Sequence, residues 1–228
     1  MLYAKETTNL TLEEIALTQN EVQSLQTYVE IVDEKRTVTN FSLLMTMVDG
    51  KICNAATGTS STMRCYLCNL TIKDFNKLEL VLQQNVNKTS LDFGLSTLHS
   101  WIRLFECPLH IAYKLPVKKW QTRCKEEKEL IAKRKKEIQQ ALKERLGLII
   151  DKLKPGFGNS NDGNTARRFF ENSKISAEIT NLDLHLIERF HIIMQTISCG
   201  YEIDLKKFKE YCLETATVYL DLYPCVST

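Results

Sequence analysis

Apolar side chains recur at helical spacing over most of the chain. This pattern predicts helices over residues 11–26, 73–84, 95–113, 117 to about 153, 181–199 and 204–222. Several ends carry matching signals, with a capping box from Thr11 to Glu14, Pro116 at a helix start, Gly200 at a helix stop and Asp204 at a cap. We therefore expect a mainly helical protein.

A second pattern interrupts the helices between residues 27 and 48. The segments 27–32 and 37–48 are rich in β-branched and apolar residues, and they flank a polar turn at 33–36. This arrangement predicts a β-hairpin. The second arm ends in a run of apolar residues from Leu43 to Val48 without a polar face, which is typical of a strand buried inside a larger sheet.

The character of the chain changes again after Asp49-Gly50. A polar stretch follows and helical patterns then dominate, so we expect a small α+β part at 1–52 and an all-helical domain at 53–228. The chain has 8 Gly and 4 Pro, too few breakers to favour an all-β fold. No apolar stretch is long enough for a membrane span or resembles a signal peptide, so we expect a soluble intracellular protein.

The net charge of +2 conceals a strongly basic segment. Residues 114–154 carry a net charge of +8, and the segments before and after them carry −3 each. The predicted helix in this segment has an apolar stripe at Leu130, Ile131, Ile138, Leu142, Leu146 and Ile149. The stripe leaves Lys133, Arg134, Lys135 and Lys136 mostly outward, either as a solvated surface or as a site for phosphate groups.

Candidate metal ligands lie in both halves of the chain. Cys65 and Cys68 have the spacing of a zinc knuckle, which is half of a tetrahedral site. Cys107 and His110 either complete that site or are ordinary packing residues. Asp49, which ends the second arm of the hairpin, is either a turn former or a metal-binding acid, and its spacing alone favours the turn. The remaining cysteines are scattered, which indicates reduced thiols.

The order of these features resembles the family of the V(D)J recombinase catalytic subunit and the Transib transposases. The resemblance rests on MVDGKICNAATGTSSTMRCYLC at 47–68, LHSWIRLFECPLHIAY at 98–113, the basic helix, and LKPGFGNSNDGNTARRFF at 153–170. It implies an RNase H-like sheet whose Asp, Asp and Glu bind two divalent metal ions, with a helical, zinc-containing insertion. Asp49 would correspond to the second acid, and Cys65 and Cys68 to the zinc cysteines. Asn164, Arg167 and Arg168 would correspond to a DNA-contacting motif.

Only one of the three family acids and two of the four zinc ligands have counterparts in this sequence. We therefore expect a transposase-derived, nuclear, DNA-binding protein that is not catalytic. Mg²⁺ or Mn²⁺ would bind only if another chain completed the site, and zinc is a further expected cofactor. The alternatives are a regulatory module that binds itself or a full-length relative, and a translated transposon remnant without a selected role.

Overall fold

The computed structural model of the protein describes residues 7–32, 35–41, 50–59, 61, 64–71, 73–88, 90, 96–119, 122–154 and 158–224. The chain forms two compact units, which we treat separately. Unit 1 comprises residues 1–75 and 79–96, and unit 2 comprises residues 76–78 and 97–228. The described residues form nine helices and two short hairpins, which confirms the mainly helical prediction. The boundary predicted after residue 52 falls inside unit 1.

Unit 1 begins with helix α1 (Thr8–Ser24), which packs against α2 (Gly50–Ala56). The cap of α1 is Thr7, whose Oγ1 accepts a hydrogen bond from the Leu10 amide at 3.2 Å. Thr11 lies inside the helix and donates its hydroxyl to the Thr7 carbonyl. The predicted start at Thr11 is therefore wrong by about one turn. Helix α3 (Leu78–Gln83) falls within the longer helix predicted at 73–84.

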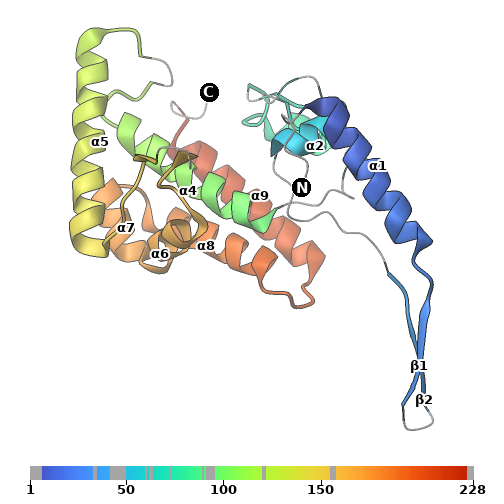
Figure 1. Ribbon diagram of the computed structural model, residues 1–228. Coiled ribbons are helices and arrows are strands. Elements are labelled where there is room, and N and C mark those ends of the chain that lie inside the picture. Colours follow the sequence, from blue (N-terminus) through green and yellow to red (C-terminus); the bar gives the residue numbers. More distant parts are fainter. Residues whose placement is uncertain are drawn as a thin grey trace. The chain divides into compact units, whose positions relative to one another are not determined.

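A hairpin is present, as predicted, and consists of strands β1 (Tyr28–Val32) and β2 (Lys35–Thr39). Strand β2 begins inside the predicted turn at 33–36 and overlaps the predicted second arm only at residues 37–39. They pair antiparallel, from Tyr28 opposite Thr39 to Val32 opposite Lys35, and Figure 1 shows them extending beyond the end of α1. Every residue of β2 is exposed, and Ile31 of β1 is 72% exposed. The expectation of a buried strand concerns the apolar run further along the second arm, not these residues. The apolar run at 43–48 lies outside the described residues.

Unit 2 is a bundle of six helices with one small hairpin among its described residues. The helices are α4 (Thr97–Lys114), α5 (Lys125–Leu146), α6 (Gly163–Glu171), α7 (Ser173–Thr180), α8 (Leu184–Ser198) and α9 (Leu205–Leu222). The predicted helices at 95–113, 181–199 and 204–222 match α4, α8 and α9. The pattern did not predict α6 and α7. Strands β3 (Leu153–Lys154) and β4 (Gly158–Asn159) form an antiparallel pair inside the domain predicted to be all-helical.

The core of unit 2 is built around α4, which contacts α5, α6, α7 and α8. Phe105 of α4 and Phe169 of α6 are fully buried, and their ring centroids lie 5.1 Å apart in an edge-to-face arrangement. Phe170 adds a second edge-to-face contact with Phe169 at 5.3 Å. Trp101 donates its indole N–H to the Ser198 hydroxyl at 3.0 Å, which joins α4 to the end of α8. Aromatic packing therefore holds the bundle together.

A buried arginine joins α8 to α9. Arg189 donates to the Thr215 hydroxyl at 2.8 Å and to the Tyr211 carbonyl at 3.1 Å. Its guanidinium also contacts the Glu214 carboxylate at 3.0 Å and lies 4.1 Å from the centroid of the Tyr211 ring. These contacts satisfy the buried charge and fix α9 against α8.

Helix α5 is shorter than the predicted range of 117 to about 153. It ends at Leu146 because Gly147 adopts a left-handed conformation with φ of 65°. Pro116 lies in the turn after α4, so it does not start α5. Ile138, Leu142 and Leu146 form the buried stripe. The predicted stripe residues Leu130 and Ile149 are 50% and 48% exposed, and Leu148 and Ile150 beyond the helix end are buried instead.

Candidate nucleic-acid interface

The exposed side of α5 carries a row of lysines. Lys133, Lys136 and Lys143 are exposed, and none of them has an ion-pair partner among the described residues. Their separations of three and seven residues bring the three side chains to one side of the helix. We call these three residues the lysine row.

The lysine row borders the chain segment that follows α5. Gln139 lies three residues after Lys136 and four before Lys143, so it shares their side of the helix. Its side-chain amide donates to the Ile150 carbonyl at 3.2 Å. This hydrogen bond places Ile150, and with it the adjoining residues Asp151 and Lys152, beside the row.

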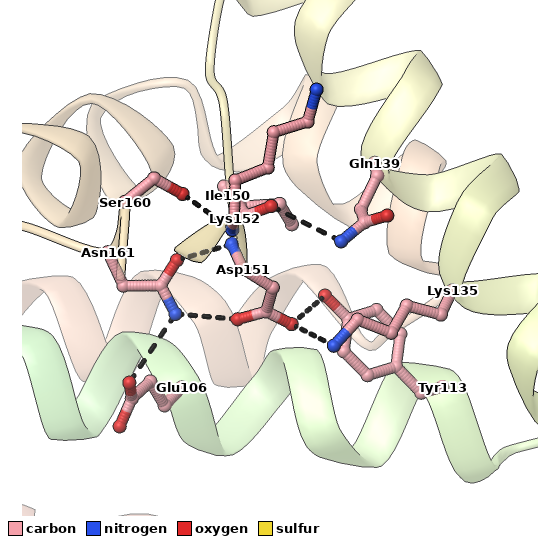
Figure 2. Close-up of polar contacts among 9 residues, drawn as sticks. All are labelled: Glu106, Tyr113, Lys135, Gln139, Ile150, Asp151, Lys152, Ser160 and Asn161. Atoms are coloured by element: carbon pink, nitrogen blue, oxygen red, sulfur yellow. Dashed lines mark hydrogen bonds and ion pairs between the residues drawn. The ribbon is translucent and has the colours of Figure 1, made fainter. Parts of the chain in front are cut away.

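Asp151 anchors that segment through a compact polar network (Figure 2). One carboxylate oxygen accepts from the Tyr113 hydroxyl at 3.0 Å and from the Lys135 ammonium at 2.7 Å. The other accepts from the Asn161 side-chain amide at 2.7 Å, and the Asn161 side-chain oxygen accepts from the Asp151 amide at 2.9 Å. The Asp151 side chain is only 10% exposed, so these bonds replace its hydration.

The environment of Asp151 keeps its carboxylate ionised. Burial by itself would raise the pKa of Asp151, but hydrogen bonds from Lys135, Asn161 and Tyr113 together with the Lys135 charge outweigh it, so the pKa is lowered. Asp151 also has φ of 51°, a left-handed conformation that Asp tolerates better than most residues. The network therefore fixes both the charge and the backbone at this position.

The same network holds the small hairpin β3–β4 at its base. The Lys152 amide donates to the Ser160 hydroxyl at 3.0 Å, next to the bonds between Asp151 and Asn161. Both side chains, Ser160 and Asn161, are buried. They extend the ladder that pairs Leu153 with Asn159. The exposed residue Lys152 is thereby held on the segment that borders the lysine row.

Of the four basic residues at 133–136 that were predicted to face outward, two bind other parts of unit 2. Arg134 donates to the carbonyls of Ile179 and Thr180, both at 3.3 Å, at the carboxyl end of α7. Lys135 pairs with Asp151 and lies 5.1 Å from the centroid of the Tyr113 ring. Lys133 and Lys136 are exposed, as predicted.

The residues of the predicted DNA-contacting motif lie on α6, where Asp162 caps the helix by accepting from the Thr165 amide at 2.8 Å. Arg168 is exposed and donates to the Leu146 carbonyl at 2.5 Å, at the end of α5. Arg167 lies 5.5 Å from the Trp101 ring centroid and donates to Asn164 at 3.4 Å. Consecutive residues point about 100° apart on a helix, so the two arginines face different neighbours.

Cys65 and Cys68 lie on one tight turn in unit 1. The Asn69 amide donates to the Cys65 carbonyl at 2.7 Å, and the Cys65 amide donates to the Leu70 carbonyl at 2.9 Å. The two thiols form a hydrogen bond, and burial raises the pKa of Cys68 against the opposing hydrogen bond from the Leu70 backbone. The turn thus presents two adjacent sulfur atoms.

These two thiols are half of the ligand set of a structural zinc ion. In the part of the chain that the structure describes, no three His, Cys, Asp or Glu side chains gather into a metal-binding set. Cys107 packs against the core of unit 2, forms a hydrogen bond with Tyr219, and has a pKa raised to about 11 by burial. Desolvation lowers the pKa of His110, against the charges of Asp151 and Glu106. The described residues alone therefore do not form a zinc site, and zinc at Cys65 and Cys68 stays a prediction.

Asp49, the predicted metal-binding acid, lies outside the described residues. Among the described helices, none is both long and apolar enough to cross a membrane. In comparisons with known proteins, no protein-family model matches the chain, and no curated protein is significantly similar to it.

Lys143, Lys152 and the Asp151 network were not among the residues predicted from the sequence. Lys143 could have been found by following the side of the helix that carries Lys136. Lys152 falls in the segment with a net charge of +8, but it lies beyond the end of α5, so helical spacing does not point to it. No sequence signal links Asp151 to Tyr113, which is 38 positions away.

Proposed function

We propose that the protein is a DNA-binding protein that contacts phosphate groups through the lysine row of α5. The observation that carries this proposal is the row itself, Lys133, Lys136 and Lys143, exposed and without carboxylate partners among the described residues. Lys152 and Arg168 add positive charge beside the row and at its carboxyl end. Rows of lysine with free ammonium groups are suited to the phosphate backbone.

A transposase ancestry is part of the proposal and rests on the sequence resemblance. The proposal includes no catalytic step, because Asp49 is the only residue in this sequence that corresponds to one of the family acids. DNA as the partner would place the protein in the nucleus. The +8 segment and the Asp151-anchored hairpin beside it support DNA contact in unit 2.

Charge reversal of the lysine row tests the proposal. The variant Lys133→Glu/Lys136→Glu/Lys143→Glu should bind a mixed-sequence DNA duplex about 100-fold more weakly or worse at low salt, since three phosphate contacts become repulsive. Fluorescence anisotropy with labelled duplex measures the affinity.

The matched control is Lys174→Glu/Lys206→Glu/Lys209→Glu, which makes the same charge change at exposed lysines of α7 and α9. We expect the control to stay within about threefold of the parent, because only the long-range field changes. Equal losses in the two variants would refute a specific role for α5. Circular dichroism would confirm that both variants remain helical.

A second candidate function is protein interaction through the hairpin β1–β2. Tyr28, Val29, Ile31 and Val38 are 56%, 43%, 72% and 49% exposed, an unusual density of apolar side chains on a two-stranded sheet. This candidate corresponds to association with a second copy or with a full-length relative. Association that persists after nuclease treatment and is lost in Ile31→Lys would favour it.

A further inference from the structure

We infer that the lysine row and Lys152 bind double-stranded DNA through its sugar-phosphate backbone alone, without preference for a base sequence. The inference rests on the proposed function and specifies the substrate. It follows from the chemistry of the side chains on the exposed side of α5, from their spacing and from the rigidity of their support.

Reading of bases requires side chains with free donors and acceptors in a fixed geometry, most often Arg, Asn or Gln. Each side-chain amide on or near the surface already forms a hydrogen bond inside the protein. Gln139 donates to the Ile150 carbonyl, Gln140 donates to Glu144, and Asn164 accepts from Arg167. Arg168, at the carboxyl end of the row, is held by its hydrogen bond to the Leu146 carbonyl. The other cations are the ammonium ions of the lysine row and Lys152, which are point charges on flexible stems. Such groups neutralise phosphates but do not distinguish bases.

The length of the lysine row fits a duplex. Lys133 and Lys143 are ten residues apart, and that separation spans about 15 Å of helix axis at about 1.5 Å per residue. Along duplex DNA, about 15 Å covers roughly four phosphates of one strand. A straight row of this length can therefore follow the backbone of a rigid duplex.

Single-stranded DNA fits this surface less well. Proteins that bind single strands combine positive charge with aromatic side chains on which the bases stack. Helix α5 contains no Phe, Tyr or Trp between Lys125 and Leu146. Tyr113, whose ring centroid lies 5.1 Å from the Lys135 ammonium, is 4% exposed and donates its hydroxyl to Asp151. The helix therefore offers charge without a stacking platform.

Helix α5 and the segment that carries Lys152 are both held in place by contacts within unit 2. Ile138, Leu142 and Leu146 bury the opposite side of α5, and the Asp151 network fixes the segment that carries Lys152. The backbone beneath the lysine row is therefore preformed, so only the lysine side chains lose conformational freedom on binding.

Binding of the full chain to a panel of duplexes tests the inference. Duplexes of about 20 base pairs with AT-rich, GC-rich and mixed sequences should bind within about threefold of one another at the same salt concentration, because only phosphates are contacted. A plot of log K against log salt should have a slope of about −3.6 if four lysines each neutralise one phosphate. Lys136→Gln should reduce that slope by about 0.9 for every duplex, and Lys206→Gln, the control, should leave it unchanged.

The outcomes separate the inference from the proposed function. A preference above about tenfold for one duplex sequence would overturn the inference and leave DNA binding standing. Tighter binding to oligo(dT) or to double-stranded RNA than to duplex DNA would overturn the assignment of the substrate. Failure to bind any nucleic acid would refute the proposed function and the inference with it.

Discussion

Replacement of Phe169 by alanine should lower the free energy of unfolding of unit 2 by about 3–5 kcal/mol. Phe169 is fully buried, and it contacts the rings of Phe105 and Phe170 at centroid distances of 5.1 and 5.3 Å. Truncation removes the apolar contacts between α4 and α6 and leaves a cavity that the aromatic neighbours fill only in part.

Urea denaturation followed by tryptophan fluorescence measures this effect. Both tryptophans of the chain, at positions 101 and 120, belong to unit 2, so the signal reports on that unit. Tyr201 is 84% exposed, and Tyr201→Ala should change the free energy by less than about 0.5 kcal/mol. A loss below about 1 kcal/mol for Phe169→Ala would contradict the packing described for the core.

Replacement of Asp151 should have the second largest effect. Asp151→Ala should lower the free energy of unfolding by about 2–4 kcal/mol, because the donor groups of Tyr113, Lys135 and Asn161 lose their acceptor. The partial exposure of Lys135, 39%, reduces its share of this cost. Alanine is also strained at φ of 51°, whereas Asn tolerates this conformation. Asp151→Asn should therefore cost less, about 1–2 kcal/mol.

The pH dependence isolates the charge of Asp151. Its pKa in the folded protein is below the ordinary value of 3.8, so the ionised carboxylate stabilises the fold at neutral pH. This contribution is fully present above the unfolded-state pKa and is lost as the pH falls through the folded-state pKa. The difference in unfolding free energy between the parent and Asp151→Asn should therefore be constant above about pH 5 and shrink below pH 3.8.

Asp221 supplies the matched control, since it is exposed near the end of α9. Asp221→Asn should change the unfolding free energy by less than about 0.5 kcal/mol at neutral pH. A difference between the parent and Asp151→Asn that does not shrink in acid would show that the variant acts through packing instead of charge.

Long, periodic segments of the sequence were sufficient to predict α4, α8 and α9. Helices α4 and α8 each bury one stripe of side chains, and the helix ends carry local signals such as Asp204, which accepts from two amides of the first turn of α9. Helices α6 and α7 are nine and eight residues long and meet at Asn172. Segments this short give too few turns for a clear period, so their burial in the bundle had to be seen in the structure.

The basic charge of α5 was evident from the sequence, but the role of each residue was not. Arg134 and Lys135 are neighbours of Lys133 and Lys136 in a run of four cations. The two flanking lysines remain exposed. Arg134 is bound because α7 packs against α5, and Lys135 is bound because Asp151 packs there. The same holds for Arg168, whose position at the end of α5 depends on how α6 packs.

The helical content, the presence of a hairpin after the first helix and the basic character of one helix could be predicted from the sequence, because these depend on local propensity and on counting charges. Which cations are free to bind a ligand could be seen only in the folded chain. That property depends on contacts between residues far apart in the chain, such as Tyr113 with Asp151 and Arg134 with Thr180. Such contacts form only when the helices pack, so no local pattern records them.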